Sequence, residues 1–254
     1  WHQITGSGTG KLNYCEVLWC SAQNNQGALY PNGGTWQFDN SIVAHCEYDC
    51  MRSYGGTFTA NNSVFMDASM GAAPSSGTAR FNNCVFSCLT TAVRWGNGTF
   101  YNCVFSDISQ DIIDTKFYSS TLSSRFFNCC FWNPNSTGDH ASAKVGQNGC
   151  FYADPLFADS ENGDFRIAAN SPCVDAGDGA AAPELDYWGQ PRMDVKAVKD
   201  TGTPNGDGVC PDIGIYEVPG AAAVPLPDLA AVSVATSATL PLAQGDTITV
   251  TYVV

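Results

Sequence analysis

The sequence predicts an all-β solenoid, in which short strands and turns stack as successive coils, followed by a C-terminal cap and a short β tail. Two observations lead to this prediction. One phrase recurs along the first half of the chain, and no stretch shows the 3.6-residue periodicity of an amphipathic helix. The polar residues are mainly Asn, Gly, Ser and Thr, which suit stacked strands and turns better than long helices.

The repeated phrase begins with Gly-Thr and ends with Asn, then Ser or Cys, then two apolar residues. Its clearest copies are GGTWQFDNSIV (33–43), GGTFTANNSVF (55–65), SGTARFNNCVF (76–86) and NGTFYNCVF (97–105), with weaker copies at 10–18 and 123–131. The Gly-Thr pairs start at Gly34, Gly56, Gly77 and Gly98, so the steps are 22, 21 and 21 residues. This period is typical of a solenoid, because one coil cannot bury its apolar face alone.

The ends of the phrase predict a bend in every coil. Gly and Asn tolerate left-handed backbone, and the Asn side chains are expected to stack as a hydrogen-bonded ladder at that bend. Cys84, Cys103 and Cys129 hold equivalent positions in successive copies, where Cys15, Ser41 and Ser63 also occur. We therefore expect these cysteines to be small, buried, free thiols.

A second strand column precedes each Gly-containing turn. Its segments are 28–30, 50–52, 92–94 and 112–114. Strand alternation places Leu29, Met51, Val93 and Ile113 in the core, and it points Tyr30, Arg52, Arg94 and Asp114 outward.

This arrangement over residues 1–157 resembles the right-handed parallel β-helix of the pectate-lyase-like superfamily. The sequence of residues 153–217 resembles the C-terminal signature of bacterial extracellular β-helix proteins of the choice-of-anchor type. The stretches that carry this resemblance are ADPLFADSENGDFRIAANSPCVDAGD, LDYWGQPRMD and DIGIYE. The resemblance implies that residues 158–218 finish the β-helix by packing on its last coils. It also implies turn and capping roles for Asp154, Asp175 and Asp212.

The last residues predict a tail. Residues 219–227, PGAAAVPLP, form a Pro/Ala linker. Residues 228–254 predict two strands around a Gly-Asp turn and resemble the start of a cell-adhesion-related immunoglobulin-like module. Either the module is incomplete, or these strands pair with another copy of the chain or with a surface protein.

Composition narrows the partners and the location. The 24 acidic and 11 basic residues give a formal charge of −13 without a basic run, so nucleic acid is not expected as a partner. No run of about 20 apolar residues predicts a membrane span. The chain does not begin with Met, and we expect a processed piece whose targeting signal lies elsewhere. The 12 cysteines favour an extracellular or cell-surface location, with Cys173 and Cys210, outside the repeats, as disulfide candidates.

No motif of a nucleophile, nucleotide or zinc site is present. Acid, base and cationic candidates near the second column are Asp111, Asp114, Lys116 and Arg94, which would suit a lyase or a hydrolase. The alternative is a solvated face on which Arg94 and Asp114 form a surface ion pair.

Two kinds of ligand remain candidates. Calcium is the one cofactor considered, at Asp200, Asn205 and Asp207 around the GDG of residues 206–208, with a plain turn as the alternative. The outward row Tyr30, Arg52, Arg94 and Asp114, with Trp95, is the candidate surface for polysaccharide.

The sequence as a whole predicts a non-catalytic extracellular β-helix that serves adhesion, surface structure or filaments. Self-assembly through the C-terminal strands and contact with glycans would accompany that role. The alternative is a secreted polysaccharide lyase or glycoside hydrolase, which the fold resemblance alone suggests.

Overall fold

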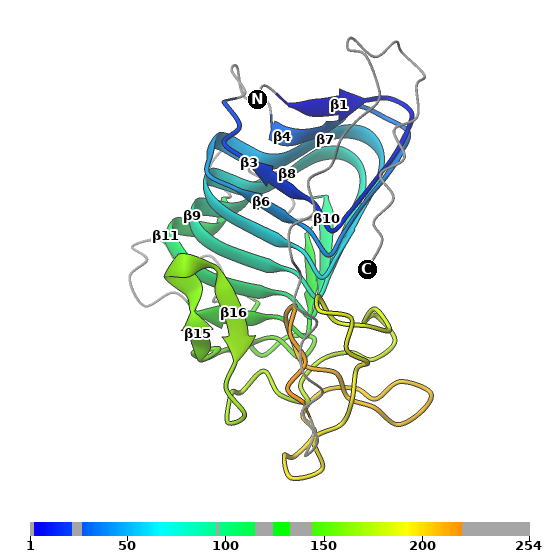
Figure 1. Cartoon of the computed structure of the whole chain (residues 1–254), viewed down its shortest axis with the longest axis vertical. Helices are drawn as coiled ribbons and strands as arrows, with labels where there is room; N and C mark the ends of the chain where they lie inside the picture. The colour runs from blue at the N-terminus through cyan, green and yellow to red at the C-terminus, as the bar shows by residue number, and fades with distance from the viewer. Residues whose placement is uncertain (1–2, 22–26, 95–96, 115–123, 133–143, 220–254) are drawn as a thin grey trace.

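The computed structural model describes residues 3–21, 27–94, 97–114, 124–132 and 144–219. It is an all-β solenoid of about 6 turns, which confirms the predicted fold class. Figure 1 shows the coils stacked from blue to green, with the yellow and orange C-terminal segment beside the later coils. Within the described ranges the one helical element is the 3₁₀ turn η1 (Ser160–Asn162), and no helix is long and apolar enough to cross a membrane.

Each coil contributes parallel strands to three faces. The first face contains β2 (Thr9–Asn13), β5 (Thr35–Asp39), the last parts of β7 (Cys46–Asn61) and β8 (Val64–Asn82), β10 (Gly98–Tyr101) and β12 (Arg125–Phe127). The second face contains β3 (Glu16–Leu18), β6 (Ile42–Ala44), the first residues of β8, β9 (Val85–Arg94) and β11 (Val104–Asp114), then β13 (Cys130–Trp132) and β14 (Phe151–Tyr152). The third face contains β1 (Ile4–Gly6), β4 (Gly27–Pro31) and the remaining parts of β7, β8, β9 and β11. An antiparallel hairpin, β15 (Phe157–Asp159) and β16 (Asp164–Ile167), follows the coils.

Left-handed backbone forms the bends between the faces. The first bend carries the asparagine column, which we define as Asn40, Asn62, Asn83, Asn102 and Asn128, all at φ between 46° and 53°. The second bend comes five residues later in each coil, and the third carries Gly34, Gly56 and Gly77. A Cβ on Gly56 would overlap the backbone of Gly33 and Gly34 in the preceding coil, so this glycine is needed for close stacking.

The asparagine column forms the predicted ladder in part, with hydrogen bonds between two of its four neighbouring pairs. Asn62 Nδ2 donates to Asn40 Oδ1 at 3.0 Å, and Asn102 Nδ2 donates to Asn83 Oδ1 at 3.1 Å. Because Asn adopts left-handed backbone more readily than most side chains, the same residue forms the bend and joins neighbouring coils.

Two columns of phenylalanine fill the core. Phe81 stacks on Phe100 with ring centroids 4.8 Å apart, and Phe86 stacks on Phe105 at 5.0 Å. The columns meet edge to face, as between Phe86 and Phe100 at 74°. The predicted core column is also confirmed, since Leu29 pairs in register with Met51 and Val93 with Ile113, and all four side chains are buried.

Cys84, Cys103 and Cys129 are buried free thiols, as predicted, whereas Cys15 is a free thiol that is only half-buried. Cys84, Cys103 and Cys129 each donate to the carbonyl two residues earlier, with distances of 3.4, 3.2 and 3.4 Å. Ser63 makes the same contact through Oγ at 2.8 Å. Either Ser or Cys therefore occurs at this position, because both are small donors that satisfy a buried carbonyl at the bend.

The C-terminal segment packs along the side of several coils, whereas packing on the last coils was expected. The asparagine column donates to its backbone carbonyls: Asn62 to Leu185 (2.8 Å), Asn83 to Asp212 (2.9 Å) and Gly214 (3.0 Å), Asn102 to Asp178 (3.0 Å), and Asn128 to Ala176 (2.9 Å). Beside these contacts, Val64, Val85 and Val104 of the second face share an apolar cluster with Ile213 and Ile215. The segment therefore buries a flank that four coils would otherwise expose.

A buried ionic network holds the end of this segment. Arg192 Nη1 lies 2.9 Å from Glu217 Oε2, and Arg192 Nη2 donates to Asn62 Oδ1 at 2.8 Å. Asp212 Oδ2 accepts the Val218 N–H at 2.7 Å. Burial raises the pKa of Asp212 to about 8, and the charge of Glu217 adds to the rise. These contacts agree with the expected capping role of Asp212.

Replacing Asn83 tests how much the asparagine column contributes to stability. Asn83→Ala is expected to lower the free energy of unfolding by about 3 kcal/mol, because two buried carbonyls lose their donor and Ala tolerates left-handed backbone poorly. Asn83→Gly removes the same amide without the backbone strain, so it should cost about 1 kcal/mol less. Urea unfolding measures both values. Equal unfolding free energies for wild type and Asn83→Ala would contradict the assignment.

Thiol alkylation tests the state of the cysteines. Iodoacetamide should modify the half-buried Cys15 and Cys88 before Cys84 and Cys103. Burial raises the pKa of the Cys103 thiol, which reduces the reactive thiolate further. Mass spectrometry after denaturation without reductant should find all 12 thiols modified. A pair that reacts only after reduction would show a disulfide and contradict the structure.

Candidate functional site

The outward row expected on the third face lies in register, but it is not uniformly exposed. Arg52 aligns with Ala73, and Arg94 aligns with Asp114. The Arg52 side chain is nevertheless buried, with the residue only 3% exposed, which corrects its assignment as an outward glycan contact. Alternation identifies the face on which a side chain lies, but it does not show whether that face is open to solvent.

Arg52 is buried because it is paired within its own strand. Its Nε lies 3.2 Å from Oδ2 of Asp49, a contact of charges in which the N–H is not aligned for a hydrogen bond. Burial raises the pKa of Asp49 to about 6, although the charges of Arg52 and Arg94 act to lower it. A buried pair of this kind stabilises weakly, but removing one partner is costly.

The described acid and base candidates are either paired with another residue of the chain or buried. Arg94 Nε donates to Asp114 Oδ2 at 3.1 Å, and little of the Asp114 side chain is exposed. Asp111 is buried on the same strand, β11, in register with Thr91. The expected pairing of Arg94 with Asp114 is therefore present. Lys116 and Trp95 lie outside the described residues.

Tyr30 remains partly exposed at one end of this row. Its ring lies 5.8 Å from that of Tyr54, which is more exposed. Tyr30 is the one described aromatic residue of the predicted glycan surface, and Tyr54 beside it was not part of that prediction.

A second group of candidates lies at the second bend, and the sequence analysis did not identify it. We define the outer corner row as Trp19, His45, Asp67, Cys88 and Asp107, all at φ between 47° and 59°. These five residues do not have one side-chain type in common, so the repeated sequence does not reveal them. Only their spacing could have identified them, because each follows the left-handed residue of the first bend by five positions.

The first three residues of the outer corner row surround an open hollow. Trp19 stacks on His45 with ring centroids 4.4 Å apart and an interplanar angle of 16°. Asp67 bonds to His45 through Nδ1 of the imidazole. Trp19 is 69% exposed, and Ser21 and Glu47 complete the polar lining. The hollow thus combines one oriented aromatic ring with two carboxylates.

The C-terminal segment contacts the other end of the row. Ser160 Oγ of η1 donates to Asp107 Oδ2 at 3.2 Å, so the C-terminal segment contacts the bend there. Asp107 nevertheless stays exposed, so what distinguishes the Trp19 end is its exposed indole and its hollow.

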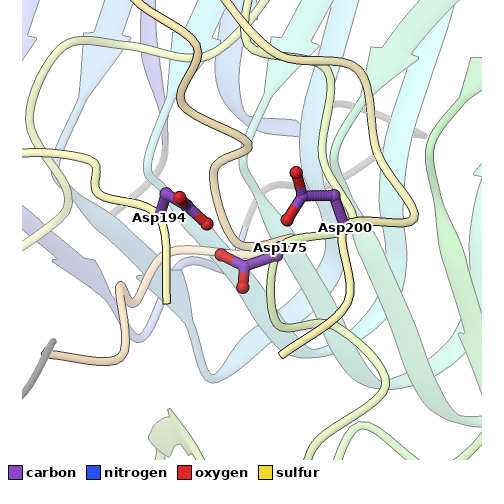
Figure 2. Close-up of side chains that lie close together, drawn as sticks. All are labelled: Asp175, Asp194 and Asp200. Atoms are coloured by element: carbon purple, nitrogen blue, oxygen red, sulfur yellow. The ribbon is translucent and has the colours of Figure 1, made fainter. Parts of the chain in front are cut away.

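Three carboxylates come together in the C-terminal segment. Figure 2 shows the Asp175 side chain between those of Asp194 and Asp200. One carboxylate oxygen from each residue lies within 4.8 Å of the others. Burial raises the pKa of Asp175, the charges of Asp194 and Asp200 add to the rise, and the hydrogen bond from the Val195 N–H opposes it.

The calcium candidates from the sequence are only partly near one another. Asp200 belongs to the carboxylate cluster, but Asp207 does not. Asn205 Oδ1 instead accepts the N–H groups of Asp207 at 2.9 Å and Val209 at 3.0 Å, which closes the expected turn. The residues that lie near Asp200 in the cluster are distant from it in sequence.

The expected disulfide is not formed in this structure. Cys173 and Cys210 are both buried free thiols, and Cys173 lies beside Cys130 of the last coils. All 12 cysteines are free thiols in this structure.

Comparison of the chain with protein-family models, curated proteins and solved structures finds no significant match. The resemblance of residues 153–217 to the choice-of-anchor type therefore stays a prediction.

The raised pKa of Asp49 predicts a pH dependence of stability. Between about pH 4 and about pH 6 the unfolded chain ionises this carboxyl while the folded chain keeps it protonated. Stability from this group is therefore present below pH 4 and is lost as pH rises, by up to about 3 kcal/mol.

Urea unfolding of wild type and Asp49→Asn across this interval measures the effect. The variant lacks the ionisable carboxyl, so its stability should fall less than that of the wild type as pH rises. Parallel pH profiles for the two proteins would disprove the assignment to Asp49.

Proposed function

We propose that this chain is a non-catalytic extracellular or cell-surface β-solenoid that contacts polysaccharide at the Trp19 end of the outer corner row. The observation that carries the proposal is the Trp19 ring, which is largely exposed and is held in a fixed orientation by His45. A ring already fixed by stacking loses little conformational freedom when a ligand binds.

The chemistry of the hollow suits a sugar. The C–H faces of a pyranose ring are apolar and can stack on an exposed indole. The hydroxyl groups at its edge can donate to the carboxylates of Glu47 and Asp67. An aromatic surface with a few convergent polar groups is a common form of small-ligand site.

Backbone strain supports a role for Trp19. A bulky side chain is rare in left-handed backbone, where Asn or Gly is accommodated more easily. Residues kept in such conformations concentrate at functional sites. The ring has little packing benefit to offset the strain, because most of its surface is exposed.

The wider role proposed is adhesion, surface structure or filament formation. It rests on the stacked coils and on the resemblance of residues 153–217 to bacterial surface proteins. Assembly with other copies or with surface proteins is proposed for residues 228–254, which, like most of the linker at 219–227, lie outside the described residues. The proposed location outside the cell rests on the same resemblance.

The catalytic alternative has less support from the described residues. A lyase or hydrolase needs acid and base groups that reach the substrate. Asp111 is buried, and Asp114 is paired with Arg94. The polysaccharide-cleaving alternative is therefore treated as an outcome of the test below.

Glycan binding by Trp19 variants tests the proposal. The full chain is expected to be retarded in affinity electrophoresis by one class within a panel of neutral and uronate polysaccharides. Trp19→Ala should weaken that binding about tenfold, because it removes the stacking surface. Tyr152→Ala is the matched control, since Tyr152 is an exposed aromatic on β14, outside the hollow.

Two results would overturn the proposal. One is equal retardation of wild type and Trp19→Ala, or no retardation by any polysaccharide. The other is the release of unsaturated products or new reducing ends, which would support the lyase or hydrolase reading instead.

A further inference from the structure

The carboxylate cluster of the C-terminal segment is built by three loops. Asp175 follows the buried Cys173, Asp194 lies just after Arg192, and Asp200 begins the next loop. The Thr201 and Gly202 N–H groups both donate to the carbonyl of Asp175 at 3.0 Å. The loops are therefore fixed around Asp175 by main-chain hydrogen bonds.

A second observation points to a ligand. Asp175 is fully buried, at 0% exposed, and its Oδ1 accepts the Val195 N–H at 3.1 Å. Its Oδ2 is buried without a hydrogen-bond partner. A buried carboxylate oxygen normally has a donor or a metal ion, because leaving it unsatisfied costs free energy. Figure 2 shows this carboxyl facing the space between Asp194 and Asp200.

The charges around the cluster do not balance within the described part of the chain. No Lys, Arg or His there forms an ion pair with Asp175, Asp194 or Asp200. The protein as a whole also carries a formal charge of −13. A cation between the three carboxylates would offset their repulsion and would satisfy the buried oxygen of Asp175.

We propose that Asp175, Asp194 and Asp200 bind a calcium ion. Carboxylate oxygens are hard ligands, and calcium accepts 6 to 8 of them in flexible geometry at about 2.3 to 2.6 Å. Ligands on opposite sides of such an ion lie about 5 Å apart, which agrees with the 4.8 Å limit on the observed oxygen separations. Main-chain oxygens and water would complete the coordination.

The position of the cluster indicates what the ion does. The Asp175 N–H donates to Asp212 Oδ1 at 2.8 Å, and Asp212 also accepts the N–H of Val218. The ion would therefore join two further loops to the part of the segment that binds the asparagine column. We expect it to stabilise the packing of the segment on the coils, independently of any glycan at Trp19.

Calcium titration of the full chain tests this inference. After treatment with chelator, millimolar calcium should raise the thermal unfolding temperature, and terbium should show luminescence sensitised by protein aromatics that calcium displaces. Asp194→Asn and Asp200→Asn should each weaken calcium binding about tenfold or more, because ligand charge sets the affinity of such sites. Both variants keep the buried Asp175, so folding is expected to be preserved.

Asp207→Asn is the matched control, because it removes the same charge from an exposed residue outside the cluster. It should bind calcium as the wild type does. An unfolding temperature that calcium does not change would overturn the inference. So would an equal shift in the Asp194→Asn/Asp200→Asn double variant, which would indicate general screening of the negative charge. Loss of binding in Asp207→Asn with retention in Asp200→Asn would place the site in the 205–208 turn and would also overturn it.

Discussion

The asparagine column is the interaction on which the rest of the structure depends. Each member adopts left-handed backbone at the first bend, and the side-chain amides link coil to coil, as from Asn102 to Asn83. The same amides donate to the main chain of the C-terminal segment. One residue type thus forms the bend, aligns neighbouring coils and binds the segment that covers the flank.

This arrangement determines which surfaces remain available for ligands. The C-terminal segment occupies the first bend and the second face, and it reaches the second bend at Asp107 through Ser160. On the third face, Arg52 and Asp49 are buried together. The Trp19 end of the outer corner row carries the exposed indole and the hollow, which is why we assign polysaccharide contact there. The carboxylate cluster lies in the covering segment, where a cation would stabilise the cover without blocking the row.

The sequence predicted those features that repeat at a fixed spacing. Glycine at the third bend and asparagine at the first recur in most of the coils, because each bend and close approach imposes the same backbone. The core column from Leu29 to Ile113 followed from alternation within short strands.

Features that depend on distant contacts were missed or only partly predicted. The outer corner row tolerates Trp, His, Asp and Cys, so residue type gave no signal although the position was regular. Arg52 is buried in an ionic contact with Asp49, which alternation does not describe. Asp175, Asp194 and Asp200 meet because loops converge, and no local spacing encodes that convergence.

The central claim, that the coils and the C-terminal segment form one cooperative unit through the asparagine column, is tested most directly by native-state hydrogen exchange. The Asn83 N–H donates to Tyr101 in the next coil, and the Gly214 N–H of the segment donates to Asn102. If the claim is right, these two amides exchange with the same opening free energy and the same denaturant dependence. Fast, denaturant-independent exchange at Gly214 beside a protected Asn83 would show that the segment detaches on its own, and it would contradict the account.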